Sequence, residues 1–167
     1  MSWSDARPTR RPTRRAVLAG GLTLLTLSAC GLTPVYGPGG AATRLWGQVR
    51  PADPRSIDDF AFNRRLAERL GGEGDTYALD YRLRVGVVAQ GITPDEVTTR
   101  YSLNGTADFT LTDASGAQVV AGQVSNFTSY STTGTTVATL AAEADARERL
   151  ARMLADQVVT RLLTAVP

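Results

Sequence analysis

The sequence contains no histidine, no lysine and a single cysteine, Cys30, among its 167 residues. Without histidine the chain cannot build a Ser-His-Asp triad, a Cys-His dyad or an imidazole-ligated metal site. With one cysteine it cannot close a disulfide on itself. Because these absences remove most catalytic and metal-binding arrangements, we predict that the protein is not an enzyme and uses no metal and no cofactor.

The overall charge of +2 comes from an uneven distribution of basic residues. Five of the 18 basic residues and one of the 16 acidic residues precede Cys30, which leaves 13 basic and 15 acidic side chains after it. The part of the chain that follows Cys30 is therefore close to neutral. We predict no nucleic-acid partner, because such a partner requires a marked basic excess.

Long hydrophobic runs are scarce, and the main one spans residues 16–29. As a helix it would be roughly 21 Å long, short of the ~30 Å hydrocarbon core of a bilayer. It follows an arginine-rich stretch over residues 1–15, and this order is typical of a cleavable export signal. The segment Thr13–Leu18 also resembles a twin-arginine signal, so both the general and the twin-arginine export routes remain open.

The hydrophobic run ends in Leu27-Ser28-Ala29-Cys30, which resembles the lipobox of bacterial lipoproteins. The resemblance implies that a signal peptide over residues 1–29 is removed and that Cys30 is lipidated. Two or more acyl chains give a stable membrane anchor. Residue 31 is glycine and not the aspartate that commonly retains lipoproteins in the inner membrane, so the resemblance implies the periplasm-facing inner leaflet of the outer membrane.

The rest of the chain reads as a flexible tether over residues 30–42, rich in glycine and proline, and one domain over residues 43–167. Thr43–Arg50 alternates weakly and is stopped by prolines, which predicts a short first strand. Ser56 is placed to cap a helix of about 14 residues. A long helix is predicted from Val137 to Ala165. Its expected apolar stripe consists of Leu140, Ala144, Ala151, Leu154, Val158 and Leu162.

Two strands with alternating apolar residues follow the first helix, and the apolar sets are odd-numbered in both. These sets are Leu79, Tyr81, Leu83, Val85, Val87 and Ala89, then Val97, Thr99, Tyr101, Leu103, Ala107, Phe109 and Leu111. Opposed residues in this hairpin must therefore have numbers with an even total, which we place near 186. That register puts Arg84 opposite Ser102 and diagonal to Arg100.

A third long strand is predicted from Ala117 to about Thr132, after a turn at Asp113–Gly116. Its apolar residues occur with both parities, which indicates either a bulge or a strand covered on both faces. The predicted order is β-α-β-β-β-α. It corresponds to an α+β two-layer sandwich, with a mostly antiparallel sheet covered on one face by two helices.

The segment Cys30–Gly37, with the sequence CGLTPVYG, resembles the start of mature LptE (formerly RlpB) lipoproteins, which assemble lipopolysaccharide (LPS). Members begin with Cys-Gly-Phe-Thr/Arg-Pro-Leu-Tyr-Gly, and Leu32 and Val35 replace the apolar pair here. The resemblance covers essentially the whole mature chain. It implies a plug inside the LptD β-barrel that assists barrel assembly and LPS delivery to the outer leaflet. The implied partners are that barrel, LPS and, through the lipid, the membrane.

Arg82, Arg84 and Arg100 are the candidate contacts for LPS phosphates or for the barrel, because arginines that meet across a hairpin repel unless an anion lies beside them. The alternative is that they are ordinary solvated side chains on an exposed sheet face. The alternative function is an auxiliary or lipid-binding lipoprotein of an ABC-type envelope lipid transporter, which would share the leader, size and fold class. Co-purification separates the two functions.

Overall fold

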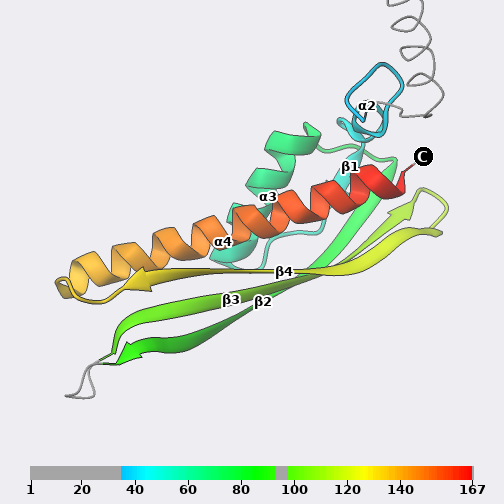
Figure 1. Ribbon diagram of the computed structural model, residues 1–167. Coiled ribbons are helices and arrows are strands. Elements are labelled where there is room, and N and C mark those ends of the chain that lie inside the picture. Colours follow the sequence, from blue (N-terminus) through cyan, green and yellow to red (C-terminus); the bar gives the residue numbers. More distant parts are fainter. Residues whose placement is uncertain (1–34, 93–97, 167) are drawn as a thin grey trace, which may run out of the picture. The chain divides into compact units, whose positions relative to one another are not determined.

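The computed structural model describes residues 35–92 and 98–166 (Figure 1). Cys30, the expected signal peptide and the first part of the expected tether lie outside these residues. The helices are α2 (Ala41–Leu45), α3 (Ile57–Leu70) and α4 (Thr136–Ala165), and the strands are β1 (Val49–Pro51), β2 (Tyr77–Ile92), β3 (Thr98–Asp113) and β4 (Gln118–Ser131).

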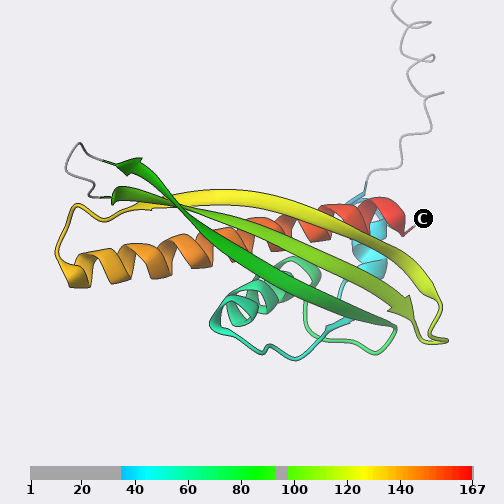
Figure 2. The same cartoon turned by 90° about the horizontal axis from the view of Figure 1, so that it is seen from below.

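The described strands form one mixed sheet in the order β1-β2-β3-β4. β1 runs parallel to β2, and the other neighbours are antiparallel. Both α3 and α4 lie on the same face of this sheet, which the two views in Figures 1 and 2 show together. The apolar side chains between the helices and the sheet form the core. This arrangement confirms the predicted α+β two-layer sandwich.

The first strand is shorter than predicted. Ala41–Leu45 is a helix, and only Val49–Pro51 pairs with β2. Ala41 and Leu45 are both buried, and their spacing of four residues places them on one side of α2. β1 is an edge strand, so Pro51 can end it without removing a hydrogen bond from the sheet interior. The expected boundary between residues 42 and 43 falls inside α2.

α3 begins and packs as the sequence predicts. The Ser56 hydroxyl accepts a hydrogen bond from the Asp59 backbone N–H at 3.1 Å, which confirms the N-cap. The Asp59 carboxylate in turn accepts from the Arg55 N–H at 2.9 Å. The apolar residues of the helix that the structure buries against the core include Phe62, Leu66 and Leu70.

α4 is 30 residues long, but its apolar stripe is covered only in part. Its buried residues begin at Ala146, whereas Leu140 is 62% exposed and Ala144 is also exposed. The first ion pair between α3 and α4 joins Asp58 to Arg147, so the first turns of α4 extend beyond the start of α3 (Figure 1). No helix within the described ranges is long and apolar enough to span a membrane.

The β2–β3 hairpin has the predicted facing but a different register. Opposed residues have numbers that add to 190 and not to 186, so Arg84 lies opposite Thr106 and Arg100 lies opposite Gln90. The predicted proximity of Arg84 and Arg100 is wrong. Arg100 lies opposite Gln90, which is six residues and roughly 20 Å further along β2 than Arg84. A slip of four residues leaves every side chain on its face, so the alternation of apolar residues could not detect it.

A bulge at Val119 explains part of the mixed parity of β4, and the exposed apolar residues Ala121 and Phe127 on the uncovered face explain the rest. Leu111 pairs with Val120 and Thr112 pairs with Gln118, which leaves Val119 as the extra residue. Beyond the bulge, Val124 lies opposite Ala107 on the helix-covered face, and the odd-numbered residues of β4 point away from the helices.

Candidate functional site

The sheet face opposite the helices is the first candidate surface, and we call it the outer sheet face. It carries the even-numbered residues of β2 and β3 and the odd-numbered residues of β4 after the bulge. Within residues 35–92 and 98–166 no helix covers it (Figure 2). Its accessible hydroxyl and amide side chains include those of Asn104, Thr106, Thr110, Gln123, Ser125 and Ser129. The predicted candidates Arg82, Arg84 and Arg100 all belong to it.

Arg84 already has an anionic partner in the fold. Its Nη2 donates to Asp108 Oδ2 at 2.6 Å, and its Nε donates to Thr106 Oγ1 at 3.4 Å. Gln123 Nε2 donates to the other oxygen of Asp108 at 2.5 Å. These contacts link β2, β3 and β4 across the outer sheet face. Sequence reasoning missed Asp108, because in the predicted register this residue lies opposite Ala78.

Arg82 and Arg100 differ from Arg84, because neither forms an ion pair with a residue in the part of the chain that the structure describes. Arg82 lies opposite Asp108, but both oxygens of that carboxylate accept from Arg84 and Gln123. Arg82 also lines a shallow polar cavity of about 350 Å³ together with Arg55. The structure therefore groups Arg82 with Arg84, separates both from Arg100, and places Arg55 beside Arg82.

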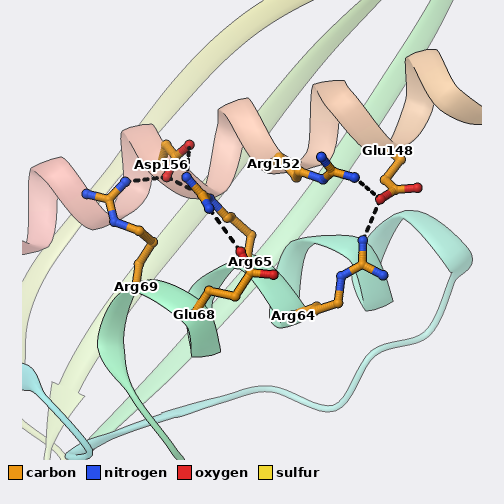
Figure 3. A network of polar contacts seen from close by, with 7 residues as sticks. All are labelled: Arg64, Arg65, Glu68, Arg69, Glu148, Arg152 and Asp156. Atoms are coloured by element: carbon orange, nitrogen blue, oxygen red, sulfur yellow. Dashed lines mark hydrogen bonds and ion pairs between the residues drawn. The ribbon is translucent and has the colours of Figure 1, made fainter.

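Ion pairs between α3 and α4 form a second polar feature, shown in Figure 3. Arg65 donates to both oxygens of Asp156, at 3.0 and 3.1 Å, and Arg69 donates to the same carboxylate at 2.5 Å. The bond to Asp156 is the main reason that the pKa of Arg65 is raised, and a bond to Glu68 adds to it. Because arginines of α3 bond to carboxylates of α4, the network fixes the two helices to each other.

Glu148 is the other shared carboxylate of this network. It accepts hydrogen bonds from Arg152 and, at 2.5 Å, from Arg64. These bonds, the one from Arg152 first, lower the pKa of Glu148. Glu148 and Arg152 form an i,i+4 pair within α4. Arg64 does not pair with Glu68, four residues on in α3, because Arg64 reaches across to α4 and Arg65 contacts Glu68 instead.

An apolar groove lies where α3 and α4 begin to diverge. It has a volume of about 660 Å³ and is lined by Ile57, Asp58, Phe60, Ala61, Arg64, Ala144, Asp145, Arg147 and Glu148. Ile57 and Phe60 are 86% and 63% exposed. Leu140 extends this apolar surface along α4, one turn before Ala144. Ile57 and Phe60 fall outside the apolar spacing of the rest of α3, and this departure was the sequence signal for the groove.

The described residues hold no cluster of three or more histidine, cysteine, aspartate or glutamate side chains that could bind a metal ion. The outer sheet face offers hydrogen bonding and positive charge, and the groove between α3 and α4 offers apolar contact. Such surfaces bind partners and ligands.

A family model described as "LptE: Lipopolysaccharide-assembly" matches residues 48–162, from the residue before β1 to the last turn of α4. The chain belongs to the LptE lipopolysaccharide-assembly family. The match confirms the resemblance drawn from the sequence. Membership identifies the protein as an LPS-assembly lipoprotein of a non-enzymatic family, which is consistent with anchoring at the outer membrane. No curated protein matches the chain.

Solved structures share the LptE-like fold. A lipoprotein from Caulobacter crescentus CB15 is 23% identical with a TM-score of 0.61, and the match covers 77% of this chain and 96% of that one. The rare lipoprotein B from Shewanella oneidensis is 12% identical with a TM-score of 0.53, over 70% and 92% of the two chains. A minor lipoprotein from Acinetobacter baumannii is 18% identical with a TM-score of 0.55, over 71% and 92%. At these identities the likeness establishes the fold.

Proposed function

We propose that the protein is the lipid-anchored subunit of an outer-membrane LPS translocon. It binds an LptD-type β-barrel, assists assembly of that barrel and helps LPS reach the outer leaflet. A lipid on Cys30, exposed by removal of residues 1–29, holds the domain at the periplasm-facing leaflet. Membership in the LptE family carries this proposal.

The outer sheet face supports binding inside a barrel. β2 and β3 each have 16 residues, which gives a surface about 50 Å long that is mostly polar but also exposes Val88 and Phe127. The lumen of an outer-membrane barrel is polar, so a plug needs hydrogen-bonding groups along its length. Hydroxyl and amide side chains supply these groups here, and no described helix hides them.

The arginines of this face supply the charge that an anionic partner requires. A guanidinium presents five N–H donors in a fork that matches phosphate and carboxylate groups. Arg82 is the strongest candidate, because both oxygens of the opposed Asp108 are already bonded to other side chains. Arg100 is the second candidate. Arg84 has its charge matched by Asp108, so we assign it chiefly to holding the strands together.

Co-purification from the native membrane tests the translocon assignment. A tagged full-length chain, extracted in mild detergent, is expected to bring down a large β-barrel protein, and depletion of the chain is expected to lower both barrel level and surface LPS. Absence of the barrel, or an ABC-type transporter in its place, would contradict the proposal. Replacing Cys30 with serine in the same strain tests the anchor: the wild-type chain is expected to incorporate labelled fatty acid and the serine variant is expected not to.

Single substitutions separate the roles of the arginines. Arg82→Ala is expected to weaken LPS binding by the purified complex about tenfold, because a charged hydrogen bond contributes roughly 1.5–3 kcal/mol. Arg84→Ala is expected to act mainly on thermal stability. Arg44→Ala is the matched control, since this exposed arginine lies on α2 and not on the outer sheet face. Equal loss of LPS binding in the Arg82 and Arg44 variants would refute the assignment.

A further inference from the structure

The sheet has a long free edge along β2. β1 pairs with β2 only from Tyr77 to Leu79. β2 then continues to Ile92, paired with β3 on one side. On its other side, no strand within the described ranges pairs with β2 beyond Leu79. Figure 2 shows this edge along the half of β2 that leads to Ile92.

Backbone hydrogen bonds reveal which groups point toward this edge. The Tyr77 N–H donates to the Gln48 carbonyl at 2.9 Å, and the Leu79 carbonyl accepts from the Ala52 N–H at 2.8 Å. The odd-numbered residues of β2 therefore direct their N–H and C=O groups outward. The register with β3 is unbroken from Tyr77 to Gln90, so this alternation continues along the strand. The outward-facing residues beyond β1 are Tyr81, Leu83, Val85, Val87 and Ala89.

The opposite edge, along β4, is partly closed by side chains. Asn126 Oδ1 accepts a hydrogen bond from the Phe127 backbone N–H at 2.8 Å. Arg149 Nη2 donates to the Ser129 carbonyl at 3.3 Å. No described side chain makes such a bond to β2 between Leu83 and Ala89, where the strand also lacks proline and a bulge. Native proteins normally block an edge of this kind unless it pairs with another chain.

We propose that the edge of β2 from Leu83 to Ala89 binds an extended segment of the barrel partner, which adds to the sheet as a further strand. The inference rests on the proposed function for the existence of that partner. Strand addition uses main-chain hydrogen bonds for affinity and the alternate side chains for specificity.

Side chains along the edge define the chemistry of the added segment. On the helix-covered face it lies beside Leu83, Val85 and Val87, so it presents apolar residues there. On the outer sheet face it lies beside Arg82, which forms no ion pair with a described residue, so it presents a carboxylate there.

A second copy of this chain does not meet that requirement. In the antiparallel register that uses all the outward-facing residues beyond β1, Val85 would lie opposite its own copy. Arg82 of each chain would then lie opposite Val88 of the other and Arg84 opposite Gly86, so neither copy would supply a carboxylate.

Val87→Pro against Val87→Ala is the decisive comparison. Val87 is 46% exposed and its N–H points outward, so proline removes an edge donor without removing a bond between β2 and β3. In full-length chains, proline is expected to lower the co-purified barrel at least about fivefold, the effect of losing one hydrogen bond and adding a clash. Alanine, which deletes the same side chain, is expected to change recovery less than about twofold.

A second measurement keeps the test valid if the proline variant fails to fold by circular dichroism. A photo-crosslinking residue at position 87 of the otherwise unchanged chain is expected to join one extended segment of the barrel. The same residue at position 125, an exposed site on the β4 edge, is the control and is expected not to join that segment.

The possible outcomes are distinct. Equal barrel recovery with the proline and alanine variants, or no crosslink from position 87, would overturn the inference and leave the proposed function standing. Crosslinks from position 87 to another copy of the chain would also overturn it. Absence of the barrel from the wild-type preparation would contradict the proposed function itself.

Discussion

Gly105→Ala should destabilise the fold, although alanine is the smallest side chain that can replace glycine. Gly105 lies on the helix-covered face of β3, directly beneath α4. A Cβ atom at this position would lie 2.9 Å from Leu150 Cδ2 and 3.0 Å from Leu154 Cδ1. Both leucines are fully buried and cannot move aside freely. The absence of a side chain at residue 105 therefore sets how closely α4 approaches the sheet.

The expected loss is about 2 kcal/mol in the free energy of unfolding, within the range of roughly 1–3 kcal/mol for overpacking a core. For a domain of this size each kcal/mol corresponds to roughly 4 °C, so the melting temperature should fall by about 8 °C. This value is the net loss in stability. The cost of overpacking is larger, but it is partly offset because alanine is intrinsically more favourable than glycine in a strand.

Gly86→Ala provides the matched control. Gly86 lies in β2 on the outer sheet face, where a Cβ atom would meet only the Asn104 carbonyl oxygen, at 3.9 Å. Since this is an ordinary contact, the substitution should be neutral or stabilise the protein by up to about 0.5 kcal/mol. The two variants replace the same residue type in neighbouring strands, so they differ mainly in the helix above Gly105.

Thermal and urea unfolding of both variants provide the assay. Leu150→Ala should cost about 2–5 kcal/mol alone. Combined with Gly105→Ala it should cost at least about 1 kcal/mol less than the two single losses together, because the new methyl group fills part of the vacated space. Equal stability of the Gly105 and Gly86 variants, or simple additivity with Leu150→Ala, would refute the close approach of α4.

Three further predictions concern polar groups. Asp156→Asn should lower the free energy of unfolding by about 1 kcal/mol, because Arg65 and Arg69 lose their shared carboxylate; this value is discounted for partial exposure. Urea unfolding measures the loss. Asp145→Asn, which breaks the exposed pair with Arg149, is the control and should have little effect. The pKa of Asp113 is lowered from its ordinary 3.8, mainly because the Ser115 hydroxyl donates a hydrogen bond to the carboxylate. The ionised Asp113 therefore stabilises the fold fully above pH 3.8, and this contribution is lost as the pH falls through the lowered pKa. The difference in urea midpoint between wild type and Asp113→Ala should therefore shrink from pH 5 to pH 2, and a constant difference would contradict the assignment. Tyr81→Phe should leave stability unchanged or raise it by up to about 1 kcal/mol, since the buried hydroxyl has no hydrogen-bond partner in the described structure, and a measured loss above about 1 kcal/mol would show that this hydroxyl is bonded.

Local patterns carried most of the fold prediction. The cap at Ser56, the alternation along β2 and β3 and the mixed parity of β4 each depend on residues close together in the chain, and the structure contains all three features. The short first strand was misplaced, because α2 spans only Ala41–Leu45 and is too short to show a helical period against the weak alternation of Thr43–Arg50.

The candidate site was predicted less well than the fold. All three arginines were assigned to the uncovered face, because facing follows from parity. Their neighbours were not predicted, because parity permits any even slip of the hairpin. The contact of Arg84 with Asp108, the separation of Arg100 and the presence of Arg55 beside Arg82 all depend on the register that the structure adopts.

The sequence by itself determined the α+β class, the facing of the central strands and the membership in the LptE family, because period, caps and motifs are properties of short segments. Only the tertiary structure decided the hairpin register, the shared carboxylates between α3 and α4, the uncovered first turns of α4 and the free edge of β2. These features join residues far apart in the chain. They arise when packing, such as that of α4 on Gly105, selects one arrangement among several that the local patterns permit equally.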